Sequence, residues 1–294
     1  MYDIIIVGMG ISGITAAIYA KRSNLNVLLI DKSAPGGMLN KIDSISNYPG
    51  LPNISGPDFA INLLNQLNDL EIPYKIEEVI SLKLKGPKKI VKTTNNEYTT
   101  KNIILALGRT PKFLGLKNEQ ELLGHGVSTC AMCDAFFYRN KEVAVVGTGN
   151  SALQESLFLT KVVSKVYLIN RRDGFRGDAY LVDQVKNNPK IEIIYKANIA
   201  SLNSEAGKLD SITLDNGDTI NIAGVFIYIG YTPDTKIVDS KLLNENGYIK
   251  VNKKLATSIK GVYAIGDCLN KDIYQLITAA SDGAIVINNI EKTK

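Results

Sequence analysis

One pattern occurs twice in this sequence and limits the possible folds more than any other feature. Residues 3–31 and residues 142–170 each contain a short β-branched run, a glycine-rich turn, a helical stretch and a second apolar run. This order of segments is typical of a β-α-β unit. Runs as apolar as these suit strands that are buried on both faces of a parallel sheet. The repeat therefore predicts an α/β protein with two similar units, whose starts lie 139 positions apart.

The chain is long enough for each unit to have its own core. At about 150 residues per domain, 294 residues make about two domains. An apolar run ending in Gly-x-Thr-Pro follows each unit, at residues 103–111 and 225–233. The segment after Pro233 is too short for a third domain, so we assign it to the first. We expect a first domain of residues 1–111 and 234–294, with residues 112–233 inserted as the second.

The first repeat contains the motif Gly-x-Gly-x-x-Gly at Gly8, Gly10 and Gly13. Its glycines allow a tight turn, a close approach of a pyrophosphate to the backbone, and close packing of helix against strand. Asp31 ends the next strand, where a carboxylate can accept hydrogen bonds from ribose hydroxyls. The motif predicts a dinucleotide site for FAD or NAD, and the alternative is a structural turn in another α/β fold.

The second repeat has the same motif at Gly147, Gly149 and Ala152, but its second strand ends differently. Asn170 stands where the first repeat has Asp31, and the segment RRDGFR follows it at residues 171–176. The two repeats therefore predict two different dinucleotides.

Three of the six arginines of the chain lie in this segment, at Arg171, Arg172 and Arg176. Guanidinium groups suit a phosphate with several oxygens, whereas a carboxylate at this position would repel one. The second site is therefore predicted to bind the 2′-phosphate of NADPH, which leaves FAD or NAD for the first. The alternative is a solvated basic turn.

A cysteine pair, Cys130 and Cys133, has the spacing of a redox centre. Two such thiols can close a small ring, exchange with disulfides and donate electrons to a flavin. Asp134 follows directly, and its carboxyl can transfer protons as thiols form. Half of a zinc site is the alternative, but only Cys268 and His125 remain as soft ligands, so no metal is expected. Two unrelated buried thiols are the other alternative.

Composition excludes several other classes of protein. The net charge is +5, from 34 basic and 29 acidic residues without long runs of like charge, so we expect neither nucleic acid nor a membrane as partner. The sequence has no basic leader and no stretch of 18 apolar residues, which predicts a soluble protein. Three cysteines without a disulfide framework suggest the cytoplasm.

Together these motifs resemble the low-molecular-weight bacterial thioredoxin reductases over essentially the whole chain. The matching segments are the first glycine motif, GGML at 36–39, NYPG at 47–50, CAMCD at 130–134, GTGNSA at 147–152, the three arginines, GYTP at 230–233, GD at 266–267 and QLITAA at 275–280. The chain also departs from this family at two positions: Tyr274 stands where the family often has arginine, and Asn170 where it usually has histidine.

The resemblance implies a homodimeric enzyme with two Rossmann-like domains, the NADPH domain being inserted into the FAD domain. It implies that Cys133 reacts with the flavin, that Cys130 attacks the disulfide of thioredoxin, and that Asp134 is the acid and base. The residues expected to bind the two cofactors are Gly8, Gly10, Gly13, Asp31, Gly36, Gly37, Met38, Leu39, Asn47, Gly147, Gly149, Asn150, Ser151, Ala152, Arg171, Arg172, Arg176, Gly266, Asp267, Gln275, Thr278 and Ala279.

The function predicted in this way is NADPH-dependent reduction of thioredoxin through FAD and the cysteine pair. Two alternatives are a related enzyme that takes electrons from ferredoxin or flavodoxin, and one that reduces another disulfide. A nucleotide-binding sensor without enzymatic activity is a third, but a sensor has no need of a dithiol.

Overall fold

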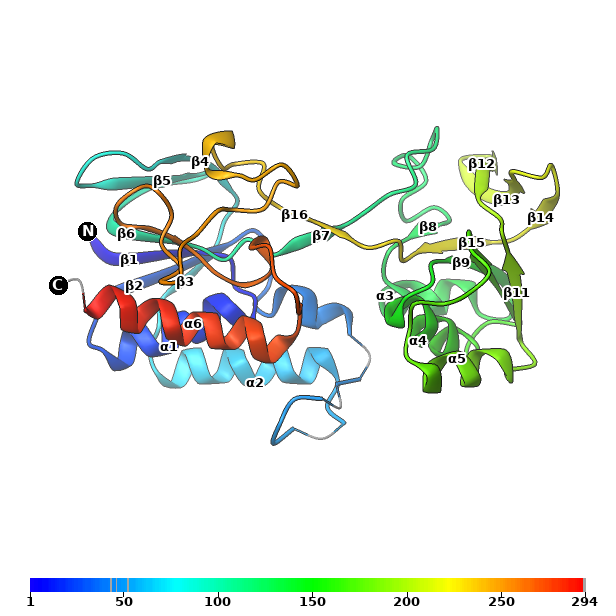
Figure 1. The fold of residues 1–294 in the computed structure, drawn as a ribbon, viewed down its shortest axis with the longest axis horizontal. Helices are drawn as coiled ribbons and strands as arrows, with labels where there is room; N and C mark the ends of the chain where they lie inside the picture. The colour runs from blue at the N-terminus through cyan, green and yellow to red at the C-terminus, as the bar shows by residue number, and fades with distance from the viewer. Residues whose placement is uncertain (43, 46, 52, 293–294) are drawn as a thin grey trace. The chain divides into compact units, whose positions relative to one another are not determined.

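The computed structural model describes residues 1–42, 44–45, 47–51 and 53–292. Its internal contacts divide the chain into two compact units. Unit 1 consists of Met1–Thr110 and Thr232–Lys294, and unit 2 is Pro111–Tyr231 (Figure 1). The two crossings between the units are the strands β7 (Arg109–Pro111) and β16 (Tyr231–Pro233), which pair with each other.

Unit 1 is built on a seven-stranded sheet of order β3-β2-β1-β6-β5-β4, with β17 also paired to β6. Strands β1, β2, β3, β6 and β17 run parallel to their partners within this set, whereas β5 pairs antiparallel with β4 and β6. Its strands are β1 (Tyr2–Val7), β2 (Val27–Asp31), β3 (Tyr74–Ile76), β4 (Val79–Lys83), β5 (Lys89–Thr93), β6 (Glu97–Leu105) and β17 (Val262–Ala264). Its helices are α1 (Ile11–Arg22), α2 (Gly56–Asp69) and α6 (Leu276–Glu291), with the 3-10 turns η1 (Gly37–Lys41), η3 (Ser240–Leu242) and η4 (Gly266–Cys268).

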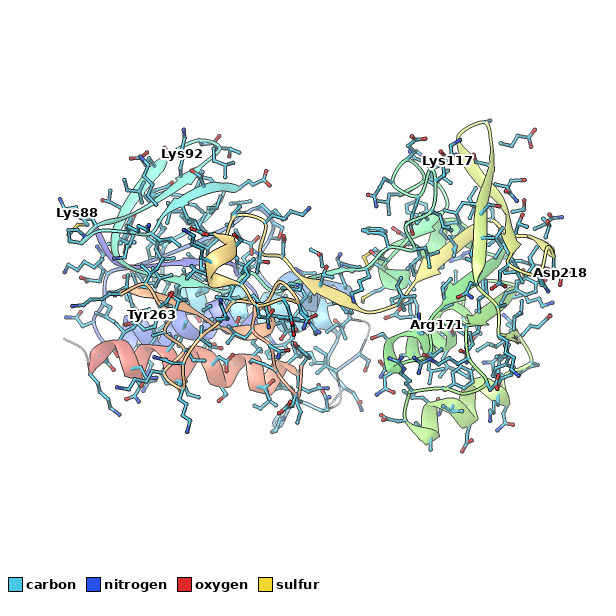
Figure 2. The ribbon with its side chains drawn as sticks, turned by 45° about the horizontal axis from the view of Figure 1, so that its top comes forward. Lys88, Lys92, Lys117, Arg171, Asp218 and Tyr263 are labelled. Atoms are coloured by element: carbon cyan, nitrogen blue, oxygen red, sulfur yellow. A yellow bond between two sulfur atoms is a disulfide. The ribbon has the colours of Figure 1, made fainter. Side chains whose placement is uncertain are left out.

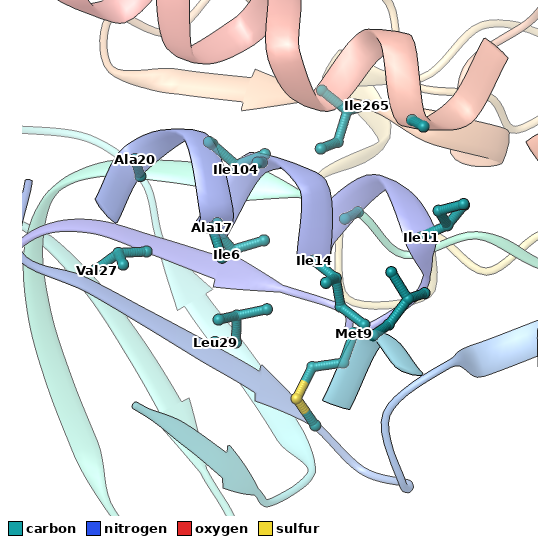
Figure 3. Close-up of a cluster of buried hydrophobic side chains, with 14 of the residues drawn as sticks. Ile6, Met9, Ile11, Ile14, Ala17, Ala20, Val27, Leu29, Ile104 and Ile265 are labelled. Carbon is teal, nitrogen blue, oxygen red and sulfur yellow. The ribbon is translucent and has the colours of Figure 1, made fainter. Parts of the chain in front are cut away.

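The helices α1, α2 and α6 lie together on one face of this sheet (Figure 1). Ile6, Leu29 and Ile104 project from neighbouring strands and pack with Ile14 and Ala17 of α1, and all five side chains are fully buried (Figure 3). Burial of each large aliphatic side chain contributes about 1.5–3 kcal/mol. This core fixes the position of the loop between β1 and α1, where the first glycine motif lies.

Unit 2 repeats the plan with a parallel sheet of order β11-β10-β9-β15-β8 and a small antiparallel sheet of order β12-β13-β14. Its strands are β8 (Val127–Ser128), β9 (Glu142–Val146), β10 (Lys165–Asn170), β11 (Ile191–Tyr195), β12 (Ile199–Glu205), β13 (Lys208–Leu214), β14 (Thr219–Asn221) and β15 (Gly224–Ile227). Its helices are α3 (Ala131–Asp134), α4 (Asn150–Leu159) and α5 (Ala179–Lys186), with the 3-10 turn η2 (Ala135–Tyr138).

The repeat in the sequence corresponds to β1-α1-β2 and β9-α4-β10, each with its two strands adjacent and parallel. The predicted α/β fold is therefore confirmed. Helix α2 begins after Ser55, whose hydroxyl accepts a hydrogen bond from the N–H of Asp58. Within the described residues, no helix has both the length and the apolar character needed to cross a bilayer.

Candidate cofactor sites and redox centre

The first glycine motif forms the turn between β1 and α1, and its first position admits only glycine. Gly8 has a φ of +113°, and a Cβ there would lie 2.2 Å from the carbonyl oxygen of Ala106. A Cβ built on Gly13 would lie 2.0 Å from the carbonyl oxygen of Gly8. Gly10 is different, because a Cβ built on it meets no atom within 4 Å, and no side chain caps the helix that it precedes. The positive end of α1 is thus open to a phosphate.

Asp31 is held beside this turn. The N–H of Met9 donates a hydrogen bond to Oδ2 of Asp31 at 2.7 Å, and the N–H and hydroxyl of Ser33 donate to Oδ1 at 3.0 and 3.1 Å. Each carboxylate oxygen has two lone pairs, so Oδ2 can still accept one hydrogen bond from a ribose hydroxyl. Gly36 approaches from the other side, donating from its N–H to the carbonyl oxygen of Met9 at 2.8 Å.

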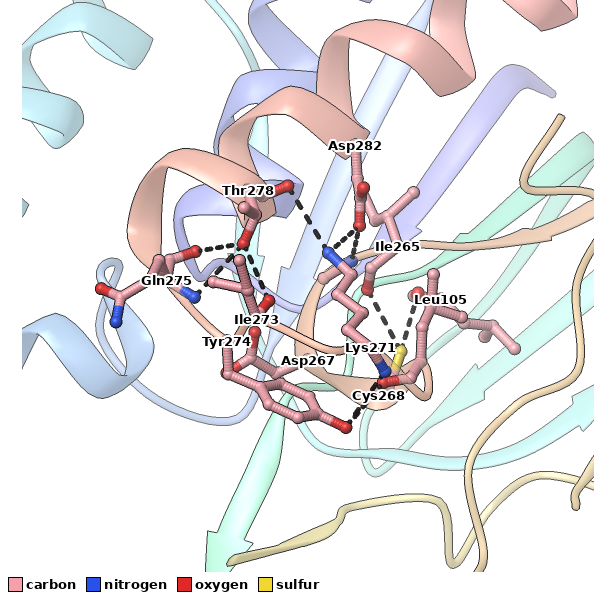
Figure 4. A network of polar contacts seen from close by, with 12 residues as sticks. Leu105, Ile265, Asp267, Cys268, Lys271, Ile273, Tyr274, Gln275, Thr278 and Asp282 are labelled. Carbon is pink, nitrogen blue, oxygen red and sulfur yellow. Dashed lines mark hydrogen bonds and ion pairs between the residues drawn. The ribbon is translucent and has the colours of Figure 1, made fainter. Parts of the chain in front are cut away.

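Several other predicted cofactor residues lie around the same helix end. Gly37 packs against Gly10, and Gly266 against Ser12 of the first turn of α1. The N–H of Gly266 donates to Oδ2 of Asp282 at 2.8 Å, and the same carboxylate forms a salt bridge with Lys271 (Figure 4). The glycine loop, Asp31 and the turn η4 are therefore gathered at one edge of the sheet.

Asp267, the next residue in η4, is held by the guanidinium of Arg109, the first residue of β7. The Nη2 and Nε atoms of Arg109 donate to Oδ2 of Asp267 at 2.9 and 3.2 Å. The Arg109 guanidinium also stacks on the ring of Tyr274, 3.7 Å from its centroid.

The remaining predicted residues of unit 1 occupy two places, the start of α6 and the turn η1. Gln275 caps α6 and accepts a hydrogen bond from the side chain of Asn47 at 3.1 Å.

Thr278 and Ala279 lie in the first turn of α6, where the hydroxyl of Thr278 contacts the backbone of Gln275 (Figure 4). Met38 and Leu39 belong to η1; Leu39 is buried in the core of unit 1, and Met38 is half-buried. The hydroxyl of Thr278 donates to backbone carbonyl oxygens just before it in the chain, and η1 begins at Gly37 beside Gly10, so these four residues stay predicted cofactor contacts.

The second glycine motif has the same local geometry. Gly147 has a φ of +151°, and a Cβ there would lie 2.4 Å from the carbonyl oxygen of Tyr228 and 2.8 Å from the Cβ of Ala152. A Cβ on Gly149 meets no atom within 4 Å, and no side chain caps α4, which begins at Asn150. This helix end, which also contains the exposed Ser151, is open to a second phosphate group.

The arginine segment lies directly against this turn. The N–H of Arg176 donates to the carbonyl oxygen of Thr148 at 2.8 Å, and Asn150 exchanges two hydrogen bonds with Asp178. The side chains of Arg171, Arg172 and Arg176 are all exposed, and Figure 2 labels Arg171. A loop with three exposed arginines thus lies beside an open helix N-terminus.

Asn170, where the resembling family usually has histidine, shapes this segment. Its side chain is fully buried, with Oδ1 accepting from the N–H of Arg172 at 2.9 Å and Nδ2 donating to the carbonyl oxygen of Gly174 at 3.1 Å. An asparagine that bonds to backbone groups two and four residues ahead stabilises a compact turn. Asn170 therefore holds the arginine-bearing loop in shape.

The predicted redox pair forms a disulfide at the start of the short helix α3. The sulfur atoms of Cys130 and Cys133 are 2.04 Å apart. Cys133 is exposed, whereas Cys130 is 7% exposed and is the less accessible of the two. The sulfur of Cys130 also accepts a hydrogen bond from the N–H of Cys133 at 3.2 Å.

Two hydroxyl groups hold this helix. The hydroxyl of Ser128 donates to Oδ2 of Asp134 at 2.6 Å and accepts from the N–H of Cys130 at 3.0 Å. The hydroxyl of Tyr228 accepts from the N–H of Ala131 at 2.8 Å. Burial, with the charge of nearby carboxylates, raises the pKa of Tyr228 well above its usual range, so the phenol stays protonated.

Comparison with known proteins identifies the kind of enzyme that combines these features. The model of the family described as pyridine nucleotide-disulphide oxidoreductase matches residues 2–284. The chain belongs to this family. The thioredoxin reductase of Bacillus subtilis (strain 168) is 36% identical to this oxidoreductase over 300 residues, covering 99% of this chain and 94% of the relative.

Solved structures agree with this assignment. Thioredoxin reductase from Lactococcus lactis has a TM-score of 0.94 at 33% identity, covering 99% of this chain and 98% of its own. A ferredoxin-flavin thioredoxin reductase from Clostridium acetobutylicum is also similar, with a TM-score of 0.55, 30% identity and coverages of 99% and 98%. The predicted family and its two-domain nucleotide-binding fold are confirmed, and membership implies a flavin and a pyridine nucleotide.

Two exposed aromatic residues of the oxidoreductase were not among the predicted site residues. Phe136 and Phe137 follow the redox pair in η2 and are 63% and 75% exposed. Large apolar side chains this accessible often mark an interaction surface. Two adjacent phenylalanines in a sequence indicate burial as readily as exposure, so only the structure distinguishes the two.

The third cysteine of the oxidoreductase, Cys268, lies in unit 1, whereas the redox pair lies in unit 2. Cys268 is fully buried beneath η4, with its sulfur 3.1 and 3.5 Å from the carbonyl oxygens of Ile265 and Leu105. Burial raises the pKa of its thiol to about 11. Cys268 is therefore a packed side chain, and the lone His125 lies in an exposed turn.

Proposed function

We propose that this oxidoreductase passes electrons from NADPH through FAD and the Cys130–Cys133 pair to oxidised thioredoxin. The observation that supports this most strongly is the disulfide at the start of α3, in the same unit as the open glycine turn and the arginine loop. A dithiol that can be closed and reopened is what disulfide exchange requires.

Unit 1 fits FAD. The open helix end at Gly10 suits the pyrophosphate, and the carboxylate of Asp31 suits the hydroxyls of a ribose without a phosphate. Gly266 and Asp267 would lie against the ribityl-phosphate part, and Gly36 and the other predicted residues of unit 1 would complete the site. Residues 1–111 and 234–294 are thus assigned to an FAD domain.

Unit 2 fits NADPH. Gly149 would receive the pyrophosphate at the start of α4, and the exposed guanidinium groups of Arg171, Arg172 and Arg176 would receive the 2′-phosphate. Asn170 leaves this edge without the carboxylate that would repel a phosphate. Residues 112–233 are thus assigned to an NADPH domain that also contains the redox pair.

The bound cofactors supply the hydride and electron transfer that amino-acid side chains cannot perform. The chain's own part is thiol exchange. The thiolate of reduced Cys130 attacks one sulfur of the thioredoxin disulfide, whose S–S bond breaks while a mixed disulfide forms. The thiolate of Cys133 then attacks the sulfur of Cys130, which closes the Cys130–Cys133 disulfide and releases the second thioredoxin sulfur. In each exchange Asp134 takes the proton of the attacking thiol and gives it to the departing thiolate, so that no net proton is needed.

The surroundings of the redox pair suit a protein substrate. Phe136 and Phe137 expose apolar rings within seven residues of Cys130, and Arg139 lies beside the ring of Phe136. An apolar surface with a basic edge fits a partner that presents its own disulfide on an apolar rim. The resemblance also supports a homodimer, and the small number of cysteines supports a cytoplasmic location.

The proposed function is tested by turnover of purified holoprotein with NADPH and oxidised thioredoxin, followed at 340 nm. We expect consumption of one NADPH per thioredoxin disulfide and much slower consumption with NADH. The same assay with reduced ferredoxin or reduced flavodoxin in place of NADPH tests the donor, since one similar structure is a ferredoxin-flavin enzyme. Turnover with either protein donor and none with NADPH would reject the proposal.

A further inference from the structure

One side chain joins both functional parts of the redox helix. The hydroxyl of Ser128 has one hydrogen, which it donates to Oδ2 of Asp134 at 2.6 Å rather than to the more distant carbonyl oxygen of Cys130 at 3.3 Å. One of its lone pairs accepts from the N–H of Cys130 at 3.0 Å. Ser128 thus bonds directly to the residue that would attack the substrate and to the residue that would supply the proton.

The position of this hydroxyl is fixed by its surroundings. Ser128 ends β8, whose backbone pairs with β15, and its side chain is 3% exposed. Water therefore has little access to replace the hydroxyl as a donor to Asp134. The neighbouring phenols of Tyr138 and Tyr228 add no negative charge beside Asp134, because burial raises their pKa values and keeps both groups neutral.

The bond to Asp134 also restricts a flexible group. A half-buried aspartate can rotate about two side-chain bonds, and proton transfer requires a defined position relative to the leaving sulfur. In this structure the backbone of Asp134 is already held, since its N–H donates to the carbonyl oxygen of Cys130 at 3.2 Å. Ser128 fixes the remaining freedom, that of the carboxylate.

We propose that Ser128 is a positioning residue of the reaction, which acts by orienting the carboxylate of Asp134 toward the sulfurs of the redox pair. This inference rests on the proposed function, in which Asp134 is the proton donor. Ser128 itself exchanges no proton with the substrate, and the effect on kcat proposed for its hydroxyl passes through Asp134.

A double-mutant cycle tests this dependence, with kcat and KM for thioredoxin measured on Ser128→Ala, Asp134→Asn and the double variant. General acid–base catalysis contributes about 10²–10⁴-fold, so partial loss of orientation in Ser128→Ala should lower kcat about tenfold and leave KM within about twofold. Asp134→Asn should lower kcat further. The double variant should be no slower than Asp134→Asn alone, because residues that act as one unit are not additive.

Two further variants separate positioning from loss of structure. Ser128→Thr keeps the hydroxyl in a strand position that favours β-branched residues, and should recover most of the loss in kcat. Ser211→Ala removes another buried hydroxyl of unit 2 that contacts an aspartate, and should leave kcat unchanged. Its hydroxyl lies in β13, outside the redox helix.

The outcomes separate the two hypotheses. If Asp134→Asn turns over normally, the acid–base role in the proposed function is wrong, and the role of Ser128 is wrong with it. If Asp134→Asn is slow but Ser128→Ala turns over normally, only the role of Ser128 is wrong. The role of Ser128 is also wrong if the losses in kcat of the two single variants multiply in the double variant. It is equally wrong if Ser128→Thr is as slow as Ser128→Ala.

Discussion

The guanidinium of Arg109 lies 3.7 Å from the centre of the Tyr274 ring, while its nitrogens bond to the carboxylate of Asp267. The resemblance to thioredoxin reductases leads one to expect an arginine at position 274. Here the ring of Tyr274 instead supports an arginine that comes from β7, at the start of the linker. A cation is therefore present in this part of unit 1 even though position 274 does not provide it.

Arg109→Met should weaken flavin binding. The substitution keeps much of the side-chain length but leaves the partly buried carboxylate of Asp267 without its cation, and such a loss costs roughly 1–3 kcal/mol. We expect the Kd of the apoprotein for FAD to rise about tenfold or more. Lys101→Met, which removes an exposed salt bridge to Asp3 in the same unit, is the control and should leave this Kd unchanged. Equal Kd values for both variants would contradict the role of Arg109.

Gly8→Ala and Gly10→Ala should fail in different ways. An alanine at position 8 requires a φ of +113° and places Cβ against the Ala106 carbonyl, so it should lower the free energy of unfolding of the apoprotein by about 2 kcal/mol or more. An alanine at position 10 has an ordinary φ of −72° and open space, so stability should change by less than about 1 kcal/mol.

Only the methyl group of Gly10→Ala projects into the space assigned to the pyrophosphate. Urea unfolding of the apoproteins, combined with FAD titration, measures both properties. We expect Gly10→Ala to be stable and to bind FAD at least about tenfold more weakly, a loss of roughly 1.4 kcal/mol. A stable Gly10→Ala variant with normal FAD affinity would show that the cofactor does not lie at this helix end.

Removing Arg171 and Arg176 together should abolish the preference for NADPH over NADH. Each charge-assisted hydrogen bond to a phosphate contributes about 1.5–3 kcal/mol, so kcat/KM with NADPH should fall at least about a hundredfold while that with NADH changes little. Arg22→Ala removes a positive charge from α1 in unit 1 and is the control. An unchanged preference in the double variant would show that the arginine loop does not bind the 2′-phosphate.

The three cysteines should react with iodoacetamide in a fixed order at pH 8. The oxidised native protein should take up no label, and the reduced native protein should take up two labels, on Cys130 and Cys133. The raised pKa of Cys268, about 11, keeps its thiol protonated at pH 8, and burial shields the sulfur from the reagent. Mass spectrometry should therefore find the third label only after unfolding. Labelling of Cys268 in the native protein at pH 8 would contradict its burial.

Cys130→Ser should separate the two halves of the reaction. In the proposed mechanism Cys130 attacks the substrate, so this variant should keep reduction of the flavin by NADPH and lose turnover with thioredoxin by at least about a thousandfold. Stopped-flow absorbance measures the first step and the coupled assay the second. Turnover near that of the unmodified protein would exclude an essential role for the dithiol.

The sequence was sufficient to predict the fold because both glycine motifs lie between strands that the core requires to be adjacent. It also pointed to Asp31, because a carboxylate at the end of the second strand of such a unit is placed to accept hydrogen bonds from a ribose. It did not identify Arg109, because nothing in the local sequence indicates that a linker residue contacts η4, some 158 positions away.

The turn-forming role of Asn170 and the contacts of Ser128 could not be predicted for a related reason. Both act through hydrogen bonds to backbone or carboxylate groups, and small polar residues have many such uses that leave no periodic pattern. The cysteine spacing predicted a redox pair, but it gave no indication that one hydroxyl joins Cys130 to Asp134. Motifs with special backbone geometry can be recognised in a sequence, whereas contacts between distant segments require the fold.

The proposed path of electrons is tested most directly by an anaerobic titration of the purified holoprotein with NADPH, followed by the flavin absorbance and by the number of free thiols. We expect NADPH to bleach the flavin band and two new thiols per chain to appear, on Cys130 and Cys133, while NADH does so far less effectively. A flavin that stays oxidised with NADPH and is reduced by reduced ferredoxin, or a flavin that is bleached without new thiols, would contradict this path.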